Sequence, residues 1–413
     1  MGVALAQWYG WSLRGEQPKA ELRGKHPNPQ SVERRPGWSI PKHAQRKRGG
    51  RVPTTKKALV VALFLILIPQ ILFGCKARSS GNETGGRKTV RCALETRTIT
   101  DMAGRTVRIP RNIESFGFPY VGTTLDFVAL GVGHQIALTP VALTRDVSLT
   151  SLLAQWGYSD IPKALGAFVG DAVNSESVLK AKPQVVFIDR RNTKGIQQVT
   201  ELGIPVIAVR FLGPRDGFSE CVDNVIWLGN IFGETAAQKA TGFKSFVDKT
   251  LGTLYSRTAG IPASKRPSVL LISYRGGIYQ GVSTRIFEEA VTAAGGRSLM
   301  DGQISHPINK EDIFVWNPDI IMLGTENQAN FDRFKNDDAL KHLKALRNGK
   351  IYPFRNYLSS TMERILQAVY MATLFHPDRF SKTYLTDQVI SFHNTMYGVA
   401  LSDEALKKYF AGY

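Results

Sequence analysis

Short apolar runs alternate with amphipathic stretches from about residue 97 to the end of the chain. This alternation predicts β-strands separated by α-helices. Each run is apolar throughout, which is typical of parallel strands that helices cover on both faces of the sheet. The predicted strands form two groups, at residues 115–118, 135–140, 184–189 and 205–211, and then at 268–274, 319–324 and 350–354.

One long amphipathic helix is predicted between the two groups of strands, over residues 234–260. Its apolar positions recur at steps of three and four residues, at Ala237, Ala240, Phe243, Phe246, Val247, Leu251 and Leu254. Gly242 and Gly252 each weaken a helix by up to about 1 kcal/mol relative to alanine, so this helix depends on packing. The predicted fold class is therefore α/β, with two Rossmann-like α/β lobes joined by a single long helix.

The strand groups and the helix divide this part of the chain. We assign an N-terminal α/β lobe to residues 97–233 and the linker helix to 234–260. A C-terminal α/β lobe follows at 261–380, and a C-terminal helical tail at 381–413.

The two predicted lobes contain a matching segment. One copy, "ESVLKAKPQVVFID", begins at Glu176, and the other, "EDIFVWNPDIIMLG", begins at Glu311. In both, six residues separate the glutamate from a proline, which is followed by a polar residue and an apolar strand. Asn174 and Asn309 are placed to cap a short helix that the proline ends. This repetition favours two similarly built lobes.

The chain of 413 residues has a formal net charge of +19, and most of this excess lies before residue 92. Residues 1–57 hold 13 Lys and Arg against 3 Asp and Glu, and residues 76–91 hold 5 against 1. Residues 1–57 are also rich in proline and glycine, so we expect a disordered basic extension there. The lobes keep an ordinary charge balance, from which we expect no nucleic-acid binding. RNA binding through the extension is the alternative.

An apolar segment follows the basic extension. Lys56 and Lys57 precede sixteen uncharged residues, "ALVVALFLILIPQILF", and then Gly74 and Cys75. A positive region, a short apolar region and a small residue are typical of a secretory signal peptide, and a membrane span needs about 20 residues. Cys75 after Leu-Phe-Gly resembles the bacterial lipobox, in which the cysteine is lipidated. Residues 58–75 are therefore assigned as signal peptide and lipobox, with an uncleaved anchor as the alternative.

The position of this signal, some fifty residues into the chain, suggests that 1–57 is a mis-called start, and we hypothesise a start at Val52. Residues 76–96 are polar and rich in glycine and serine, which predicts a flexible tether. The lobes are then exported, as a periplasmic or cell-surface lipoprotein anchored to the membrane.

At this point the sequence resembles a known family, the substrate-binding proteins of bacterial ABC importers for iron–siderophore complexes, haem and cobalamin. The resemblance covers residues 97–413, and its ordered motifs are "TITDMAGRTVRIP", "LDFVALGVGHQIALTP", "SESVLKAKPQVVFID", "ELGIPVIAV", "VIWLGNIFGE", "NKEDIFVWNPDIIML", "LKALRNGKIYPF" and the tail from His376.

The resemblance implies a ligand cleft between two lobes that a rigid helix joins. It implies that Glu176 and Glu311 dock onto arginines of the membrane permease, which works with its ATPase. An acid in the first turn of a helix also complements the helix dipole, for about 0.3–1 kcal/mol, and this is the competing explanation of each glutamate. We expect a monomer without a cofactor, whose ligand is a ferric chelate or a corrinoid.

Ligands of open α/β sheets bind beyond the carboxyl ends of the strands. Aromatic and arginine side chains at these ends suit an anionic metal chelate with an organic frame. The predicted ligand-binding residues are Tyr120, Arg145, Arg190, Arg191, Tyr274, Arg275, Tyr279, Arg355 and Tyr357, with Phe118 and His306 beside them. Surface arginines and core tyrosines are the competing interpretation of each residue taken alone.

The sequence offers little support for a direct metal site or for catalysis. The seven histidines show no i, i+4 pair on a predicted helix, so we predict no direct metal site. Cys92 and Cys221 are candidates for a disulfide in an oxidising compartment. Phosphate loops, H-E-x-x-H and G-x-S-x-G are missing from the sequence, so we predict no enzyme activity. Siderophore-bound iron is the first choice of ligand. The alternatives are cobalamin, haem or a molybdate-type oxyanion, and more remotely a chelatase-like enzyme.

Overall fold

The computed structural model describes residues 95–145, 147–211, 215–303, 305–325, 327–354, 362–403 and 406. The predicted extension, signal segment and tether, with Cys75, therefore lie outside the described residues, apart from the last two positions of the tether. Among the helices of the described residues, none combines the length and apolarity that crossing a membrane requires.

The first lobe is built on a sheet of six strands among the described residues, in the order β6-β5-β4-β3-β7-β8. All neighbouring strands are parallel except the edge pair β5 and β6. Helices and sheet strands alternate along the chain, as predicted. The strands are β3 (Phe116–Gly117), β4 (Ile136–Pro140), β5 (Leu165–Val169), β6 (Ala172–Val173), β7 (Val185–Asp189) and β8 (Val206–Val209).

The second lobe has a mixed sheet of six described strands, with the path β12-β10-β9-β13-β14 and β11 beside β9. Its centre is parallel as predicted, but β9 continues into an antiparallel hairpin with β10, and β12 joins β10 antiparallel. The strands are β9 (Ser268–Arg275), β10 (Ile278–Gly281), β11 (Arg297–Ser298), β12 (His306–Ile308), β13 (Ile320–Thr325) and β14 (Ile351–Pro353).

A separate antiparallel hairpin, β1 (Thr96–Thr100) with β2 (Thr106–Pro110), opens the described chain. Asp101 in its turn is buried and anchors the hairpin to the first sheet, because its carboxylate accepts the N–H of Ala208 at 3.0 Å. Burial alone would raise the pKa of Asp101, but hydrogen bonds from Arg105 and backbone amides lower it below its usual value.

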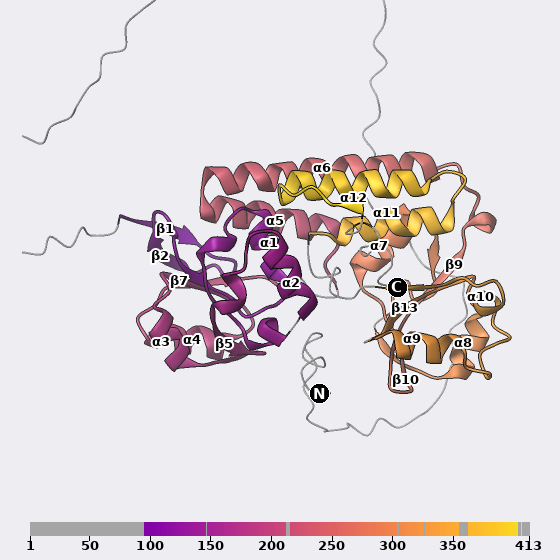
Figure 1. Cartoon of the computed structure of the whole chain (residues 1–413), viewed down its shortest axis with the longest axis horizontal. Coiled ribbons are helices and arrows are strands. Elements are labelled where there is room, and N and C mark those ends of the chain that lie inside the picture. The colour runs from indigo at the N-terminus through magenta and orange to yellow at the C-terminus, as the bar shows by residue number, and fades with distance from the viewer. Residues whose placement is uncertain are drawn as a thin grey trace, which may run out of the picture. The chain divides into compact units, whose positions relative to one another are not determined.

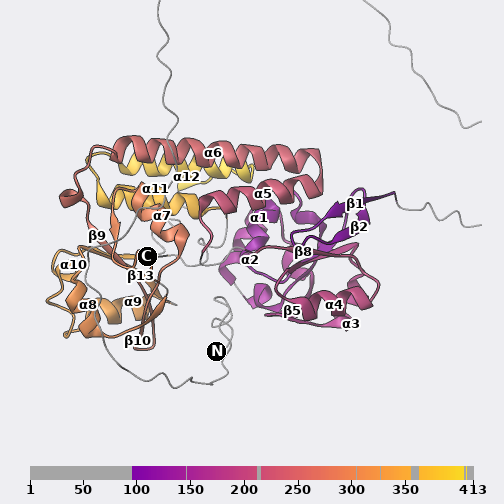
Figure 2. The same ribbon diagram turned by 180° about the vertical axis from the view of Figure 1, so that it is seen from behind.

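The longer helices of the two lobes gather in one layer. Figure 1 shows α6 along one side of the molecule, with α5, α11 and α12 next to it, and Figure 2 shows the same from behind. Helices of the described residues are α1 (Thr123–Ala129), α2 (Val147–Gln155), α3 (Ser175–Ala181), α4 (Thr193–Glu201), α5 (Phe218–Phe232), α6 (Glu234–Thr258), α7 (Arg285–Ala293), α8 (Lys310–Trp316), α9 (Gln328–Lys335), α10 (Lys344–Arg347), α11 (Arg364–Phe375) and α12 (Lys382–Met396).

The long helix predicted over 234–260 is α6, and a second helix runs beside it. The first turn of α5 is bonded to the second lobe, since Phe218 N–H donates to Glu289 of α7 at 2.8 Å. Its last turn packs in the first lobe, where the ring of Phe232 lies 5.0 Å from that of Phe116. The single helix of the sequence-based prediction is thus one half of an antiparallel pair, because α5 also spans the lobes.

One apolar core continues through the helical layer and reaches both sheets. Alternation along the strands decides which face each residue covers. In β7, Val185 and Phe187 point into this shared core, whereas Val186 and Ile188 belong to a smaller core on the other face. In β9 the shared core receives Val269 and Leu271, and its far face has its own core.

Candidate functional site

Polar and aromatic residues follow three neighbouring strands of the first lobe. Tyr120 comes after β3, Arg190 and Arg191 come after β7, and Phe211 comes after β8. Since β3, β7 and β8 are parallel neighbours, their carboxyl ends meet at one edge of the sheet. We call these residues, with Asp171 and Asp189, the strand-end cluster.

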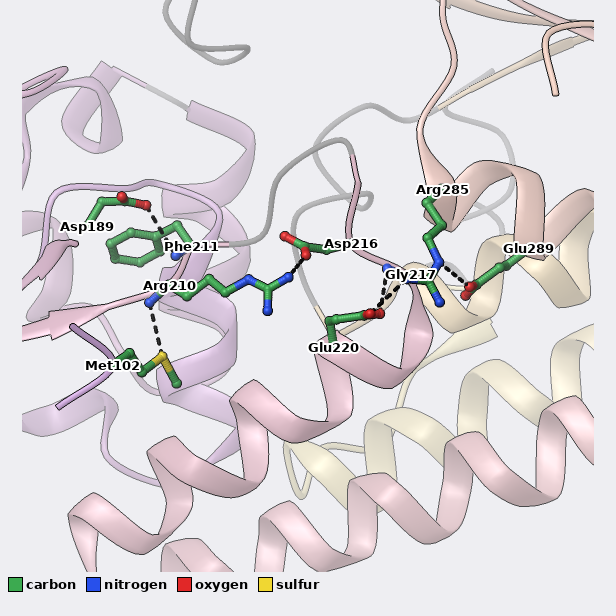
Figure 3. Close-up of polar contacts among 9 residues, drawn as sticks. All are labelled: Met102, Asp189, Arg210, Phe211, Asp216, Gly217, Glu220, Arg285 and Glu289. Carbon is green, nitrogen blue, oxygen red and sulfur yellow. Dashed lines mark hydrogen bonds and ion pairs between the residues drawn. The ribbon is translucent and has the colours of Figure 1, made fainter. Parts of the chain in front are cut away.

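Asp189 organises the strand-end cluster. It ends β7, is buried, and accepts Arg191 Nε at 2.8 Å and Nη2 at 2.9 Å. It also accepts the backbone N–H of Arg191 at 2.8 Å and that of Phe211 at 3.2 Å, the latter drawn in Figure 3. The hydrogen bond to Asp189 raises the pKa of the Arg191 guanidinium, so Arg191 stays charged.

Tyr120 supplies an aromatic surface to the cluster. Its ring lies 4.2 Å from the ring of Phe211, centroid to centroid, and its hydroxyl donates to Asp171 at 3.3 Å. Burial, together with the negative charge of Asp171, raises the pKa of Tyr120 well above its usual value. The phenol is therefore neutral and can act as a hydrogen-bond donor at physiological pH.

Both arginines of the cluster are exposed, and Arg190 is the one without an ionic partner among the described residues. Its side chain forms no hydrogen bond or ion pair with another residue that the structure describes, whereas Arg191 is held by Asp189. An anion that approaches this edge of the sheet would pair with Arg190 at the lowest cost. Only the backbone of Arg145, the last residue of a short 3₁₀ turn after β4, is described, so its predicted role is not tested.

Two predicted ligand residues of the second lobe lie in its core. Tyr274 is 3% exposed and Tyr279 is 9% exposed, and they face each other across the β9–β10 hairpin with ring centroids 5.0 Å apart. Phe334 of α9 closes over Tyr274 at 5.6 Å, and the Tyr279 hydroxyl donates to Asp337 at 3.2 Å. This burial argues against a ligand contact for either ring, because the hairpin turns both of them inward.

The other ligand-binding residues predicted in the second lobe are described only in part. Arg275 ends β9 and is partly exposed, and His306 begins β12 with its ring 6.5 Å from that of Trp316. Arg355 and Tyr357 lie outside the described residues. Of the predicted residues of the first lobe, the structure brings Tyr120, Arg190 and Arg191 to one sheet edge, whereas Phe118 is fully buried in the core.

The two predicted docking glutamates occupy equivalent helices. Glu176 lies in α3 and Glu311 in α8, each of seven residues and each capped by an asparagine. Asn174 Oδ1 accepts an N–H of the first turn at 3.0 Å, and Asn309 Oδ1 does so at 2.8 Å. Both glutamates are exposed, and neither has a hydrogen bond or ion pair within the described part of the chain.

Charged residues connect the lobes near the start of α5, as Figure 3 shows. Arg285 of α7 donates to Glu220 of α5 at 2.7 Å and to Glu289 at 2.9 Å. A Cβ at Gly217 would lie 2.3 Å from Glu289 Oε1, so a larger residue where α5 meets α7 would force the Glu289 side chain to move. On the first-lobe side of this junction, Arg210 pairs with Asp216.

Sequence reasoning missed the carboxylates of the strand-end cluster. Asp189 is the last letter of the predicted strand "QVVFID", and an acid at the end of an apolar strand was the available signal. Asp171 lies in the turn of the β5–β6 hairpin and carried no such signal. Among the described residues, no group of three His, Cys, Asp or Glu is placed to hold a metal ion. Cys221 is a buried free thiol whose pKa burial raises to about 11, and Cys92 lies outside the described residues.

Comparison with known proteins relates the chain to one family. The periplasmic binding protein family matches residues 154–358. The molybdate-binding protein MolA of Haemophilus influenzae is 23% identical over 347 residues, which span 74% of this chain and 92% of MolA. Over these residues the chain is similar to the periplasmic binding proteins.

Further relatives agree with this in sequence and in fold. The Fe(3+)-citrate-binding protein YfmC of Bacillus subtilis is 20% identical over 301 residues, which span 72% of this chain and 89% of YfmC. The crystal structure of a periplasmic solute binding protein from Veillonella parvula has a TM-score of 0.65 at 19% identity, covering 77% of this chain and 97% of that one. The two-lobed α/β fold is thus the fold of this family, whose matched members are binding proteins.

Proposed function

We propose that this protein is the substrate-binding protein of an ABC importer and that it binds an anionic metal chelate, with a ferric chelate as the first choice. The observation that carries the proposal is the strand-end cluster, in which two exposed arginines and two neighbouring aromatic rings follow the carboxyl ends of parallel strands. A chelate whose carboxylate, catecholate or hydroxamate oxygens surround a metal offers anionic oxygens to Arg190 and an organic frame to Tyr120 and Phe211. The Fe(3+)-citrate-binding relative supports this choice.

A molybdate-type oxyanion is the second candidate, and the relative MolA is the observation that favours it. The two ligand classes need different contacts from the protein. A small oxyanion has no organic frame, so it would depend on Arg190 and on N–H donors, whereas a chelate would also use the two aromatic rings. Cobalamin and haem, which have large organic frames, belong with the chelates in this respect.

Fluorescence titration of the purified protein tests the proposal. The panel contains ferric citrate, ferric siderophores, cobalamin, haem and molybdate, with a sugar, a peptide and an amino acid as controls. We expect tight binding of one member of the metal-containing panel, and the ligand should be released chemically unchanged. Tight binding of only a sugar, peptide or amino acid would overturn the assignment, and turnover of the ligand would favour an enzyme.

Phe211 and Tyr120 offer aromatic contacts that only an organic chelate can use, so a substitution there distinguishes the two ligand classes. Tyr120→Leu should weaken binding of an organic chelate several-fold, because a flat aromatic contact is lost, and should leave molybdate binding nearly unchanged. Arg190→Gln should weaken both classes. If neither substitution changes the affinity for any ligand of the panel, the strand-end cluster is not the binding site.

We further propose that the protein is exported and held at the membrane by a lipid on Cys75, and that Glu176 and Glu311 dock onto basic residues of the permease, whose ATPase drives uptake. Their equivalent, exposed helices support this role. The double variant Glu176→Arg, Glu311→Arg should abolish uptake of ferric citrate by cells and leave its binding to the purified protein unchanged. Unimpaired uptake would refute the docking role.

A further inference from the structure

The helices α3 and α8 match each other more closely than docking by glutamates alone requires. Residue by residue, the two helices have the same order of exposed, partly exposed and buried positions. Each buries a single residue, Val178 in α3 and Ile313 in α8. Each also ends in a left-handed residue, Lys182 with φ 48° and Asn317 with φ 39°, and these two are the described non-glycine residues with positive φ. Two independent stretches of chain therefore present one rigid shape.

An apolar side chain accompanies the glutamate on each helix. Leu179 is 50% exposed on α3, and Phe314 and Val315 are 39% and 83% exposed on α8. Leu179 and Phe314 each stand three residues after the glutamate, so they lie on the same helix face as its carboxylate. These three make up half of the six large apolar side chains that are exposed among the described residues. Single exposed apolar residues are ordinary, but a matched concentration marks an interaction surface.

The fold has no need of these apolar residues. Each helix is attached by its one buried residue, by a partly buried residue that packs on the core (Ala181 or Trp316), and by the buried proline that follows it. A polar residue at position 179 or 314 would leave these contacts in place. The exposed positions are thus available for a partner.

We infer that each lobe docks through a combined polar and apolar contact, formed by Glu176 with Leu179 on α3 and by Glu311 with Phe314 and Val315 on α8. The partner is a membrane protein that offers, at two sites, an arginine or lysine beside an apolar side chain. This inference rests on the proposed function and extends its docking surface. In both views α3 and α8 lie on the side of their lobes away from α6, so one partner surface can meet both (Figures 1 and 2).

On α8, charge favours a protein over a lipid surface as the partner. Glu311 and Asp312 both stand in the first turn of α8, next to the exposed Phe314. An anionic membrane surface would repel these two carboxylates, whereas a basic side chain of a protein would be attracted to them. The same repulsion opposes pairing of α8 with α8 of a second copy of this chain.

The two contacts are unequal in strength. The position that Val315 occupies on α8 is occupied by Lys180 on α3. A lysine four residues after Glu176 weakens the attraction for a basic partner side chain and removes an apolar contact. The contact through α8 should therefore contribute more of the docking affinity than the contact through α3.

Uptake of ferric citrate by cells that carry the full-length protein tests the inference. We expect the pair Phe314→Ser, Val315→Ser to lower uptake at sub-saturating ferric citrate about tenfold, and Leu179→Ser about threefold, because exposed apolar area can no longer be buried. Binding of ferric citrate to the purified variants should stay at the wild-type level. The matched control is Tyr255→Ser, an exposed aromatic residue on α6, which should change neither quantity.

The charge-reversed variant separates the two levels of the proposal. If the serine variants take up ferric citrate normally while Glu176→Arg, Glu311→Arg does not, the apolar contact is refuted and the docking glutamates stand. If the charge-reversed variant is also normal, the proposed docking fails as a whole.

Photo-crosslinking in cells identifies the partner. A benzoylphenylalanine at position 179 or 314 should crosslink to an integral membrane permease subunit, identified by mass spectrometry, and one at position 255 should not. Crosslinks to phospholipid, to a second copy of the chain or to nothing would overturn the inference.

Discussion

The strand ends of the two lobes carry the same kinds of residue but use them differently. In the first lobe Tyr120, Asp189 and Arg191 form a polar cluster at the edge of a parallel sheet, and Arg190 beside them is exposed. In the second lobe Tyr274 and Tyr279 are buried. The cause is the element that follows the strand. After β3 and β7 the chain turns into a helix, whereas after β9 it folds back as β10 and covers its own tyrosine. A tyrosine after an apolar strand therefore has no fixed role.

Removing a tyrosine ring from the second lobe should have the largest effect. Tyr274→Ala should lower the free energy of unfolding by about 3–5 kcal/mol, because it leaves a cavity between β9, β10 and α9. Tyr120→Ala in the first lobe should cost clearly less, because that ring is at the sheet edge. Urea denaturation measures both. Tyr274→Phe keeps the ring and should remain within about 1 kcal/mol of wild type; an equal loss in the two alanine variants would contradict the contrast between the lobes.

The free energy of unfolding should depend on pH through Asp126, a residue at the contact between the lobes. This first-lobe carboxylate accepts the N–H of Met362, at the start of the second lobe's α11, at 2.7 Å. Burial raises the pKa of Asp126 to about 7, against the opposing effect of Arg364 and with a smaller contribution from Glu363. The folded state then holds a proton that the unfolded state releases near pH 4. Stability should therefore fall by roughly 3–4 kcal/mol as the pH rises from 4 to 7.

The variant Asp126→Asn isolates this dependence, since the amide oxygen can still accept from Met362 and does not titrate. Its denaturation profile should be flatter than that of wild type between pH 4 and 7. Asp101→Asn is the matched control with the opposite sign. The pKa of Asp101 is lowered, so its contribution is present at neutral pH and is lost below about pH 4. Identical profiles for wild type and Asp126→Asn would refute the role of Asp126.

Within the strand-end cluster, substitutions of the two neighbouring arginines should differ in their effects on ligand affinity and on stability. Arg190→Gln should raise the dissociation constant for ferric citrate about tenfold, the loss of one charge-assisted contact. Arg191→Gln should raise it only a few-fold, because Asp189 already neutralises that guanidinium. Arg191→Gln should instead lower stability by about 1–3 kcal/mol, since the buried Asp189 loses two donors. Fluorescence titration and urea denaturation of both variants measure the difference, and a reversed order would contradict it.

The smallest effect is expected at the ends of the matched helices α3 and α8. Lys182→Gly should raise the free energy of unfolding by about 0.5–1 kcal/mol, because glycine adopts the left-handed conformation without strain. Asn317→Gly should bring no gain. Asparagine tolerates this conformation, and Asn317 Oδ1 accepts the N–H of Lys344 at 2.9 Å. Thermal denaturation compares the two, and a gain at position 317 alone would show that the helix ends are not equivalent.

Much of the fold could be predicted from local pattern. The seven apolar runs lie on seven strands of the structure, with boundaries that differ by one or two residues, and the helix predicted over 234–260 is α6 (Glu234–Thr258). The repeated segment predicted two equivalent capped helices, and Asn174 and Asn309 do cap α3 and α8. These features were accessible because caps, prolines and apolar runs act over a few neighbouring residues.

The site was less accessible. In β9, Tyr274 lies on the same face of the sheet as Leu270 and Ile272. The burial of its ring could have been inferred only by knowing that α9 covers this face. Asp171 reaches Tyr120 from a hairpin 51 residues away in sequence. The short strands β6, β10, β11 and β12 lack a long apolar run, and their pairing partners define them.

The sequence by itself determined which apolar runs form strands, where the long helix lies, and that two similar lobes each carry a capped helix with a glutamate in its first turn, because each of these follows from the spacing of residues near one another. The tertiary structure alone decided that α5 and α6 both span the lobes and that Asp189 pairs with Arg191 and not with Arg190. It also decided that two tyrosines of the second lobe lie in the core. These outcomes depend on which distant segments pack together, and burial and hydrogen bonding then assign a different role to the same residue type.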